Sequence, residues 1–274
     1  MDLVERDSRI RAILLQGSRA NKKVLPDPLQ DYDIVLIVNQ MESFLMDPTW
    51  TSIFGDRIIW QLPDEMDIGS QLNATGSFHY LMLFTDGSRI DLTLFPKNNM
   101  ENHFKLDSLT NLWLDKDGLF SQIDSPDDKD YLICRPTEKK FADCCNEFWW
   151  VSTYVSKGLK RSEITYAKAM MDGPVRQMFM RMIAWYIGTE TGFSVSFGKE
   201  GRFMKNHLDE DDYNQILKTY PDYKIENIWN SLFLMTDLFS QHAARVSDSM
   251  QFKLNCLESE NVKKYLHQQY AEQK

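Results

Sequence analysis

The chain has 274 residues, with 31 Lys and Arg against 40 Asp and Glu, which gives a formal net charge of −9. This acidic balance argues against a protein whose main task is to neutralise nucleic-acid phosphates, because that task relies on basic side chains. The hydrophobic fraction of 43% is ordinary for a globular protein, and the longest aliphatic run, Ile34 to Val38, is far too short to span a bilayer. Composition therefore excludes a disordered chain and predicts no membrane partner.

The spacing of cysteines and histidines indicates the redox compartment of the protein and whether it has a zinc site. The four cysteines show no C-x-x-C spacing, and the five histidines form no H-x-x-x-H pair. We therefore expect free thiols in a reducing, cytoplasmic setting and no zinc site. The charged stretch Met1–Asp7 has no apolar signal-peptide run and favours the same location.

The first hundred residues read as mixed α/β structure. Short apolar or β-branched runs bounded by turn residues predict strands, and Asp86-Gly87 between two such runs predicts a hairpin. Residues 21–30, with two prolines, read as a loop. The predicted strands are Ile10–Gln16, Tyr32–Val38, Ile58–Leu62, Phe78–Phe84 and Arg89–Phe95.

Beyond residue 135 the apolar residues recur at three- and four-residue spacing, which predicts helices. Gly173-Pro174 is expected to break or restart the second of them. The acidic stretch Ser121–Asp130 reads as a linker, so we predict an α/β domain over 1–135 and an all-helical domain over 136–274. The predicted helices are Glu138–Leu159, Glu163–Thr189, Asp211–Thr219 and Ile225–Val246.

Three acidic residues in the front half stand out because of where they occur. Asp31 and Asp33 lie two apart at the start of a strand, so their side chains point to the same face. Asp91 lies in an otherwise apolar strand, where an unpaired carboxylate is costly to bury. Three converging carboxylates repel one another unless a divalent cation offsets them, and oxygen-only ligation suits Mg²⁺.

The turn after the first strand, Gly17-Ser18-Arg19, offers a complementary feature. Its small residues leave backbone N–H groups free to hold a triphosphate, and Arg19 can add charge-assisted hydrogen bonds. Taken alone, a D-x-D pair or a Gly-Ser turn is usually a cap or a turn. Here the features occur together: a strand is followed by Gly-Ser, a loop, a strand with D-x-D, and a hairpin with a third Asp. This combination favours a metal and triphosphate site over isolated turns and caps.

These residues carry a resemblance to known proteins. Gly17-Ser18-Arg19, Asp31-x-Asp33 and Asp91 resemble the signature of the nucleotidyltransferase superfamily related to DNA polymerase β. Longer blocks resemble the aminoglycoside 6-adenylyltransferases (streptomycin adenylyltransferases), from about residue 8 into the C-terminal helices. Those blocks are Leu15–Arg19, Gln30–Asp33, Ile53–Gly55, Asp86–Thr93 and Cys144–Trp149.

The resemblance implies transfer of AMP from MgATP to a hydroxyl of a cationic aminoglycoside, an antibiotic-modifying reaction that releases pyrophosphate. It implies an α+β fold, with a polymerase-β-like nucleotidyltransferase domain of mixed sheet and flanking helices, then a helical bundle that binds substrate. The active site is expected in the cleft between the two domains. Asp31, Asp33 and Asp91 would hold two Mg²⁺ ions, and Asp91 is a candidate general base. Gly17, Ser18 and Arg19 would hold the β- and γ-phosphates.

The first predicted helix of the back domain carries two stripes. Phe141, Cys144, Phe148, Val151, Val155 and Leu159 form the core stripe. The other stripe contains Asp143, Glu147, Trp150, Tyr154, Lys157 and Arg161. A solvated face explains its charges but not its two aromatic residues, so a cleft-lining face is favoured.

On that second stripe, Asp143 and Glu147 are expected to meet cationic groups of the acceptor, and Trp150 and Tyr154 to line its site. Lys157 is expected to reach a phosphate, as a helical-domain lysine does in several relatives. Glu147 is an alternative general base.

Three other functions remain as alternatives. The first is the same chemistry on a different small-molecule or protein acceptor. The second is a non-catalytic protein on the same scaffold, which is disfavoured because all three carboxylates are present. The third is an RNA-tailing polymerase, which is disfavoured by the acidic charge. The sequence does not predict the oligomeric state.

Overall fold

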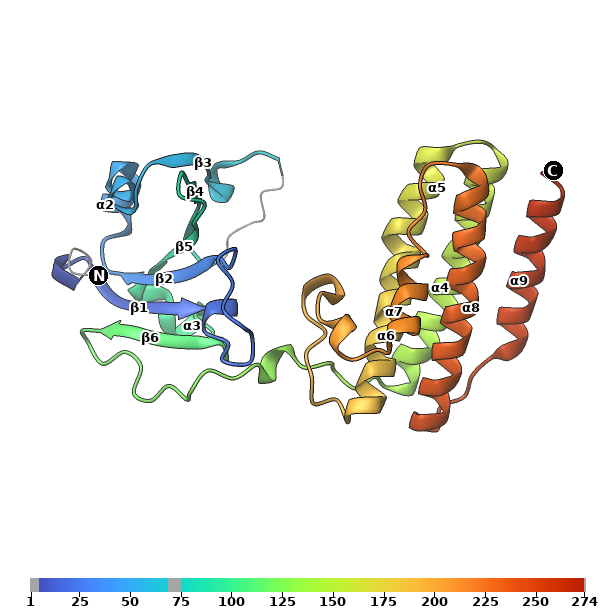
Figure 1. The fold of residues 1–274 in the computed structure, drawn as a ribbon. Coiled ribbons are helices and arrows are strands. Elements are labelled where there is room, and N and C mark those ends of the chain that lie inside the picture. Colours follow the sequence, from blue (N-terminus) through green and yellow to red (C-terminus); the bar gives the residue numbers. More distant parts are fainter. Residues whose placement is uncertain (1–4, 69–74, 274) are drawn as a thin grey trace. The chain divides into compact units, whose positions relative to one another are not determined.

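The computed structural model describes residues 5–68 and 75–273 and divides into two compact units, Met1–Asp130 and Tyr131–Lys274. The sequence placed the boundary at residue 135. The N-terminal residues 1–4, part of the stretch examined for a signal peptide, lie outside the described residues. Figure 1 shows a sheet in the first unit and long helices in the second.

The first unit is built on a six-stranded mixed sheet with the order β3-β4-β5-β2-β1-β6. Neighbouring strands run antiparallel except β2 and β5, which are parallel and join the two antiparallel parts of the sheet. The strands are β1 (Ile10–Gln16), β2 (Tyr32–Val38), β3 (Arg57–Gln61), β4 (Phe78–Phe84), β5 (Arg89–Pro96) and β6 (Thr110–Asp115). Among the described residues, the short helices α2 (Met41–Leu45) and α3 (Met100–His103) accompany them.

Alternation along the strands builds a separate apolar cluster on each face of the sheet. On one face Leu36 and Val38 pack with Tyr80 and Leu92. The other face has a smaller cluster that includes Val35 and Ile37 of β2, with residues around α3 packed against it. Asp33 lies two residues before Val35, so it belongs to this second face, at the end where β2 begins.

The second unit is helical in the part that the structure describes. Its long helices pack around one apolar cluster that includes the whole predicted core stripe of α4, with Phe148 stacked on Phe239 at 3.7 Å between ring centroids. The helices are α4 (Glu138–Lys160), α5 (Ile164–Met170), α6 (Arg176–Thr191), α7 (Glu210–Leu217), α8 (Ile225–Met250) and α9 (Cys256–Ala271).

The structure confirms most predicted elements and corrects several. A π-helical turn at Met171–Val175 divides the helix expected over residues 163–189, as Gly173-Pro174 predicted. β3 begins one residue earlier than expected, and β6 and α9 were not predicted. The acidic stretch 121–130 is part of the first unit rather than a free linker, because Asp128 pairs with Lys23 and the Asp127 N–H donates to the Ser108 carbonyl at 2.9 Å.

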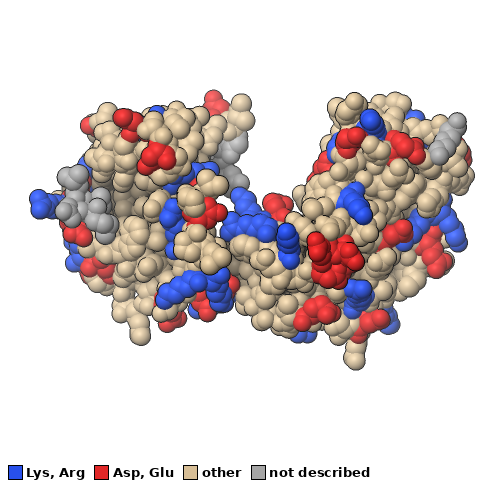
Figure 2. Space-filling model, viewed as in Figure 1, with Lys and Arg blue, Asp and Glu red and all other residues tan. Residues whose placement is uncertain are grey.

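On the face drawn in Figure 2, acidic and basic side chains are interspersed over each unit. Among the described helices, none combines the length and the apolar character that a membrane crossing requires.

Candidate active site

The sheet unit brings the three acidic residues to one end of neighbouring strands. Asp33 on β2 and Asp91 on β5 are direct register partners across the parallel pair. Asp31 precedes β2 by one residue and shares the face of Asp33 by strand alternation. The Arg89 guanidinium lies 3.7 Å from the Asp31 carboxylate and is hydrogen-bonded to Asp91, so one cation touches both. We call Asp31, Asp33 and Asp91 the carboxylate cluster.

Gly17 follows β1 directly and makes room for this cluster. Its φ is +70°, in the left-handed region, and its N–H donates to the Leu109 carbonyl at 3.1 Å. A Cβ atom at this position would lie 2.2 Å from Oδ2 of Asp33, which no real contact allows. Glycine is therefore required here twice, for the backbone conformation and for the close approach of Asp33.

The electrostatics of the cluster are unfavourable to the charge on Asp33. The pKa of Asp33 is raised to about 6, first by burial and then by the negative charges of Asp91, Asp31 and Asp107, while the charge of Arg89 acts to lower it. Like charges held this close destabilise one another in the absence of a counter-ion. The site is thus arranged to attract positive charge.

Arg89 supplies part of that positive charge. Its Nε donates to Oδ1 of Asp91 and its Nη2 to Oδ2, each at 2.8 Å, so both oxygens of that carboxylate are hydrogen-bonded. Its side chain is 44% exposed. Sequence reasoning gave Arg89 no role, although its position two residues before Asp91 on one strand already places both on the same face.

The Gly17–Arg19 turn lies beside the cluster and is tied to the loop that leads into β2. The Arg19 guanidinium donates to the Gln30 carbonyl at 2.7 and 3.0 Å and lies 3.7 Å from the centroid of the Tyr32 ring. The Ser18 carbonyl accepts a hydrogen bond from Gln30. In this structure Arg19 therefore braces the loop before Asp31.

The donor chemistry of the cluster suits Mg²⁺, which prefers carboxylate oxygens. In the observed rotamers, however, no three His, Cys, Asp or Glu side chains within the described ranges are grouped to hold an ion. The Asp91 carboxylate is hydrogen-bonded to Arg89. In residue type and strand register the three residues fit a magnesium site.

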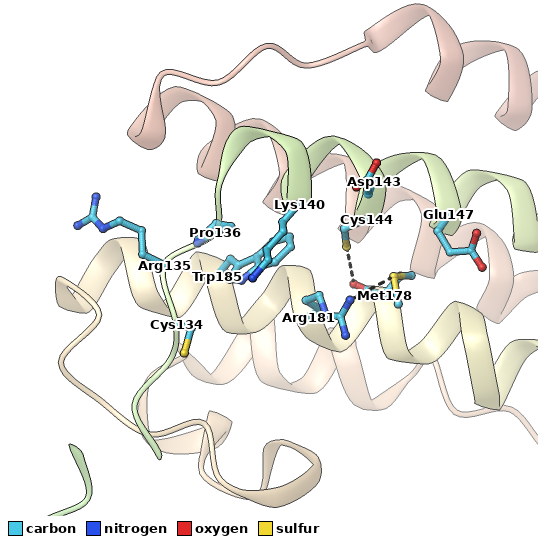
Figure 3. A pocket seen from close by; sticks show the side chains of 10 residues that line it. All are labelled: Cys134, Arg135, Pro136, Lys140, Asp143, Cys144, Glu147, Met178, Arg181 and Trp185. Atoms are coloured by element: carbon cyan, nitrogen blue, oxygen red, sulfur yellow. Dashed lines mark hydrogen bonds between the residues drawn. The ribbon is translucent and has the colours of Figure 1, made fainter. Parts of the chain in front are cut away.

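The helical unit contains a pocket of about 590 Å³ between α4, α6 and the segment before α4 (Figure 3). Two of the predicted acceptor-binding residues, Asp143 and Glu147, line it. Asp143 also pairs with Lys139 on the same helix. The full lining is Cys134, Arg135, Pro136, Lys140, Asp143, Cys144, Glu147, Met178, Arg181 and Trp185.

Three cations of this lining were missed by sequence reasoning: Arg135, Lys140 and Arg181. No carboxylate of the described chain forms an ion pair with any of them. Lys140 was detectable, since it precedes Asp143 by three residues on one helix face. Arg181 was not, because only packing brings α6 beside α4.

The other predicted residues of the α4 stripe lie outside this pocket lining. Trp150 is 61% exposed, and its Nε1 donates to the Tyr154 hydroxyl at 2.8 Å. The Lys157 ammonium lies 5.3 Å from the centroid of the Tyr154 ring. These three residues therefore form a small group of their own further along α4.

Comparisons with known proteins show the family to which the chain is similar. The family described as "Streptomycin adenylyltransferase" matches residues 1–269. An aminoglycoside 6-adenylyltransferase of Bacillus subtilis is 41% identical over 254 residues, 92% of this chain and 89% of that protein. One from Campylobacter jejuni is 39% identical over 98% of this chain and 92% of its own length.

A solved structure is also similar: the crystal structure of an aminoglycoside 6-adenyltransferase from Bacillus subtilis. It is 36% identical, covers 98% of this chain and 95% of its own, and superposes with a TM-score of 0.50. The relatives are named aminoglycoside 6-adenylyltransferases, which are nucleotidyltransferases, and the match spans both units. The chain therefore belongs to the streptomycin adenylyltransferase family, a family of nucleotidyltransferases.

Proposed function

We propose that this protein transfers AMP from MgATP to a hydroxyl of an aminoglycoside of the streptomycin type and releases pyrophosphate. The carboxylate cluster carries the proposal, because Asp33 and Asp91 are paired across parallel strands at the end where Gly17 leaves space. The names of the relatives support the acceptor class. In this proposal the sheet unit is a polymerase-β-like catalytic domain and the helical unit binds substrate.

The proposed reaction is an in-line displacement at the α-phosphorus of ATP. The bond from the acceptor oxygen to the α-phosphorus forms, and the bond from the α-phosphorus to the bridging oxygen of pyrophosphate breaks. Mg²⁺ held by Asp31, Asp33 and Asp91 would supply positive charge for the attacking and leaving oxygens. The hydroxyl proton goes to a carboxylate, with Asp91 as the first candidate and Glu147 as the second.

The backbone N–H groups of the Gly17–Arg19 turn are proposed to hold the β- and γ-phosphates, as amides in such turns bind anions. Arg19 would contribute once its guanidinium leaves the Gln30 carbonyl, which is a rotation of one side chain. Lys157 is proposed as a further phosphate ligand from the helical unit.

The mixed charge of the α4–α6 pocket suits a ligand pair of opposite charge. Asp143 and Glu147 would receive ammonium or guanidinium groups of the acceptor, while Lys140 and Arg181 would favour phosphate. Trp150 and Tyr154 would extend the acceptor surface along α4. The acceptor and the nucleotide together present both kinds of charge.

The direct test is pyrophosphate release by the purified chain with ATP, Mg²⁺ and a panel of aminoglycosides that includes streptomycin. We expect release with streptomycin and none with Asp33→Asn as the matched control. If pyrophosphate is released with a different hydroxyl compound and not with any aminoglycoside, the proposed reaction stands and the proposed acceptor is wrong. No release with any member of the panel would overturn the proposed function.

A paired substitution tests the pocket. Glu147→Gln is expected to raise the KM for the acceptor about tenfold, and Arg181→Gln to raise the KM for ATP by a similar factor, since each removes one charge-assisted contact. Equal effects of both variants on both substrates would argue against separate charge roles.

A further inference from the structure

Arg89 lies inside the carboxylate cluster rather than beside it. Its guanidinium donates to both oxygens of Asp91 at 2.8 Å and lies 3.7 Å from Oδ2 of Asp31. The neighbouring Asp33 is also influenced by the charge of Arg89. One arginine therefore acts on all three carboxylates, and it does so from the same strand as Asp91.

The hydrogen bonds of Arg89 use the carboxylate that a metal ion would also need. An Arg–carboxylate fork takes both oxygens in one plane and fixes the rotamer of the acid. A divalent cation at Asp91 would add two positive charges within a few ångströms of the guanidinium, where they repel it. The Arg89 side chain is 44% exposed, so it has an open route into solvent.

We propose that Arg89 is a positioning residue that competes with the divalent cation for Asp91, and so sets how tightly this enzyme binds its metal. This inference rests on the proposed function, which assigns the metal to the same three carboxylates. Without metal, Arg89 offsets the repulsion within the cluster and holds Asp91 in place. When metal binds, Arg89 gives up Asp91 and turns outward.

A different role for Arg89 would change metal affinity in the opposite direction, so the two roles can be tested against each other. An arginine that only oriented Asp91 for the metal would strengthen metal binding, and its removal would weaken it. Competition predicts instead that removal of Arg89 strengthens binding, because the carboxylates lose a rival cation. The direction of the change in metal affinity separates the two roles.

The experiment uses Mn²⁺ alone as the probe, with the full chain and without nucleotide. Free Mn²⁺ is measured by electron paramagnetic resonance for the wild type, Arg89→Gln, Arg89→Lys and Asp33→Asn. We expect Arg89→Gln to bind Mn²⁺ about tenfold more tightly than wild type, the size of effect that a charge-assisted pair gives. Arg89→Lys keeps the charge without the fork and is expected to fall between the two.

Arg11 provides a matched control in the same unit. It also binds a carboxylate through two nitrogens, with Nε 2.8 Å from Oδ2 of Asp117 and Nη2 on the other oxygen. Asp117 belongs to a different group of charges, which includes Lys97. Arg11→Gln therefore removes an equivalent fork and should leave Mn²⁺ affinity at the wild-type value.

Thermal unfolding gives a second readout that does not depend on activity. Arg89→Gln should melt below wild type in a chelator and gain more from saturating Mn²⁺, because its carboxylates have lost their internal counter-ion. If Arg89→Gln does not fold, Arg89→Lys carries the same test.

The outcomes separate the inference from the function. In one outcome the wild type binds Mn²⁺, Asp33→Asn does not, and the Arg89 variants bind it as tightly as the wild type or less tightly. That result would overturn the role of Arg89 and leave the metal site standing. Wild type and Asp33→Asn that bind Mn²⁺ equally, or not at all, would overturn the metal site and the inference together.

Discussion

Each unit contains an ionisable side chain whose charged form is disfavoured by burial, an acid in the sheet unit and a base in the helical unit. In the sheet unit Asp33 is partly buried next to Asp91, Asp31 and Arg89, so its environment combines desolvation with strong nearby charges. In the helical unit His242 is 1% exposed and lies against the Tyr186 ring, and neither ring nitrogen has a hydrogen-bond partner in the described chain. The first arrangement destabilises the unit but prepares a site for cations, whereas the second destabilises it and offers no such site.

This difference shows how burial should be interpreted in the two units. A buried charge that is surrounded by further charges at a strand end, with a glycine making room, indicates chemistry. A buried polar ring among apolar side chains indicates a packing compromise. The following substitutions test that distinction.

Removal of the charge at Asp33 should have the largest effect, in opposite directions on activity and stability. Asp33→Asn is expected to reduce turnover about a thousandfold or more, because it removes a carboxylate that we propose as a metal ligand. The folded pKa near 6 lies above the unfolded value of 3.8, so the folded state holds the proton to higher pH. The free energy of unfolding of the wild type therefore falls as pH rises from about 4 to 6. At pH 8 and without metal, Asp33→Asn should be more stable than the wild type by about 1–2 kcal/mol after allowance for solvent screening.

Urea unfolding in a chelator at pH 8 measures this gain. Asp115→Asn is the control. Burial raises the pKa of Asp115, but several backbone N–H groups, those of Phe120 and Leu119 first among them, together outweigh burial and lower the pKa. That variant should lose stability at pH 8. A loss in both variants would mean that Asp33 is stabilised like an ordinary structural acid.

Gly17→Ala should reduce turnover about a hundredfold, because a shift of about 1 Å in a reacting group has an effect of that size. The new Cβ would meet Oδ2 of Asp33, and the left-handed backbone would add about 1–2 kcal/mol of strain. Gly87→Ala is the control, with φ of +84° and no atom within 4 Å of the new Cβ. It shares the strain without the clash, so similar kcat losses in both variants would refute the close-approach argument.

His242→Phe should remove an acid-sensitive weakness of the helical unit. Burial lowers the pKa of His242 to about 4, while the unfolded residue titrates near 6.5. The unfolded state therefore takes up the proton first as pH falls, and wild type should lose about 2 kcal/mol between pH 7 and pH 5 from this residue.

Unfolding of His242→Phe at both pH values should show this loss removed. The exposed His267, stacked on Phe233, offers a comparison: His267→Phe makes the same replacement at the surface of this unit and shows what the loss of a histidine ring alone does to unfolding. An unchanged profile in His242→Phe would show that the ring is not the source of the acid sensitivity.

Trp150→Ala should have the smallest effect, about a threefold rise in the KM for the acceptor with the KM for ATP unchanged, as expected for one partly exposed contact. Tyr154→Phe, which removes only the hydroxyl that accepts the Trp150 hydrogen bond, separates this bond from the aromatic surface. A rise in the KM for ATP alone would reassign this part of α4 to the nucleotide.

Local patterns were sufficient for much of the fold and for the composition of the carboxylate cluster. β-branched runs and Asp86-Gly87 predicted the strands around the site, and strand alternation placed Asp31 and Asp33 on one face. β6 was missed because the exposed face of its alternation carries the apolar Trp113, so Leu112 to Leu114 shows no polar–apolar alternation, and only pairing with β1 identifies it as a strand. α9 has a weak apolar face with one buried residue, Leu266.

Tertiary packing decided what the sequence could not predict. The register match between Asp33 and Asp91 depends on a parallel pairing across more than fifty residues of intervening chain. The contribution of Arg181 to the pocket depends on α6 packing beside α4. Both are non-local facts, and no periodicity within one segment contains them.

The distribution of thiols has a practical consequence for spectroscopy. Cys134 and Cys256 are exposed, while burial raises the pKa of Cys144 to about 12 and suppresses its thiolate. Every cysteine of the sequence lies in the helical unit. A maleimide dye will therefore attach to that unit alone, and a dye on Cys134, which lines the pocket, will report directly on the arrival of a ligand there.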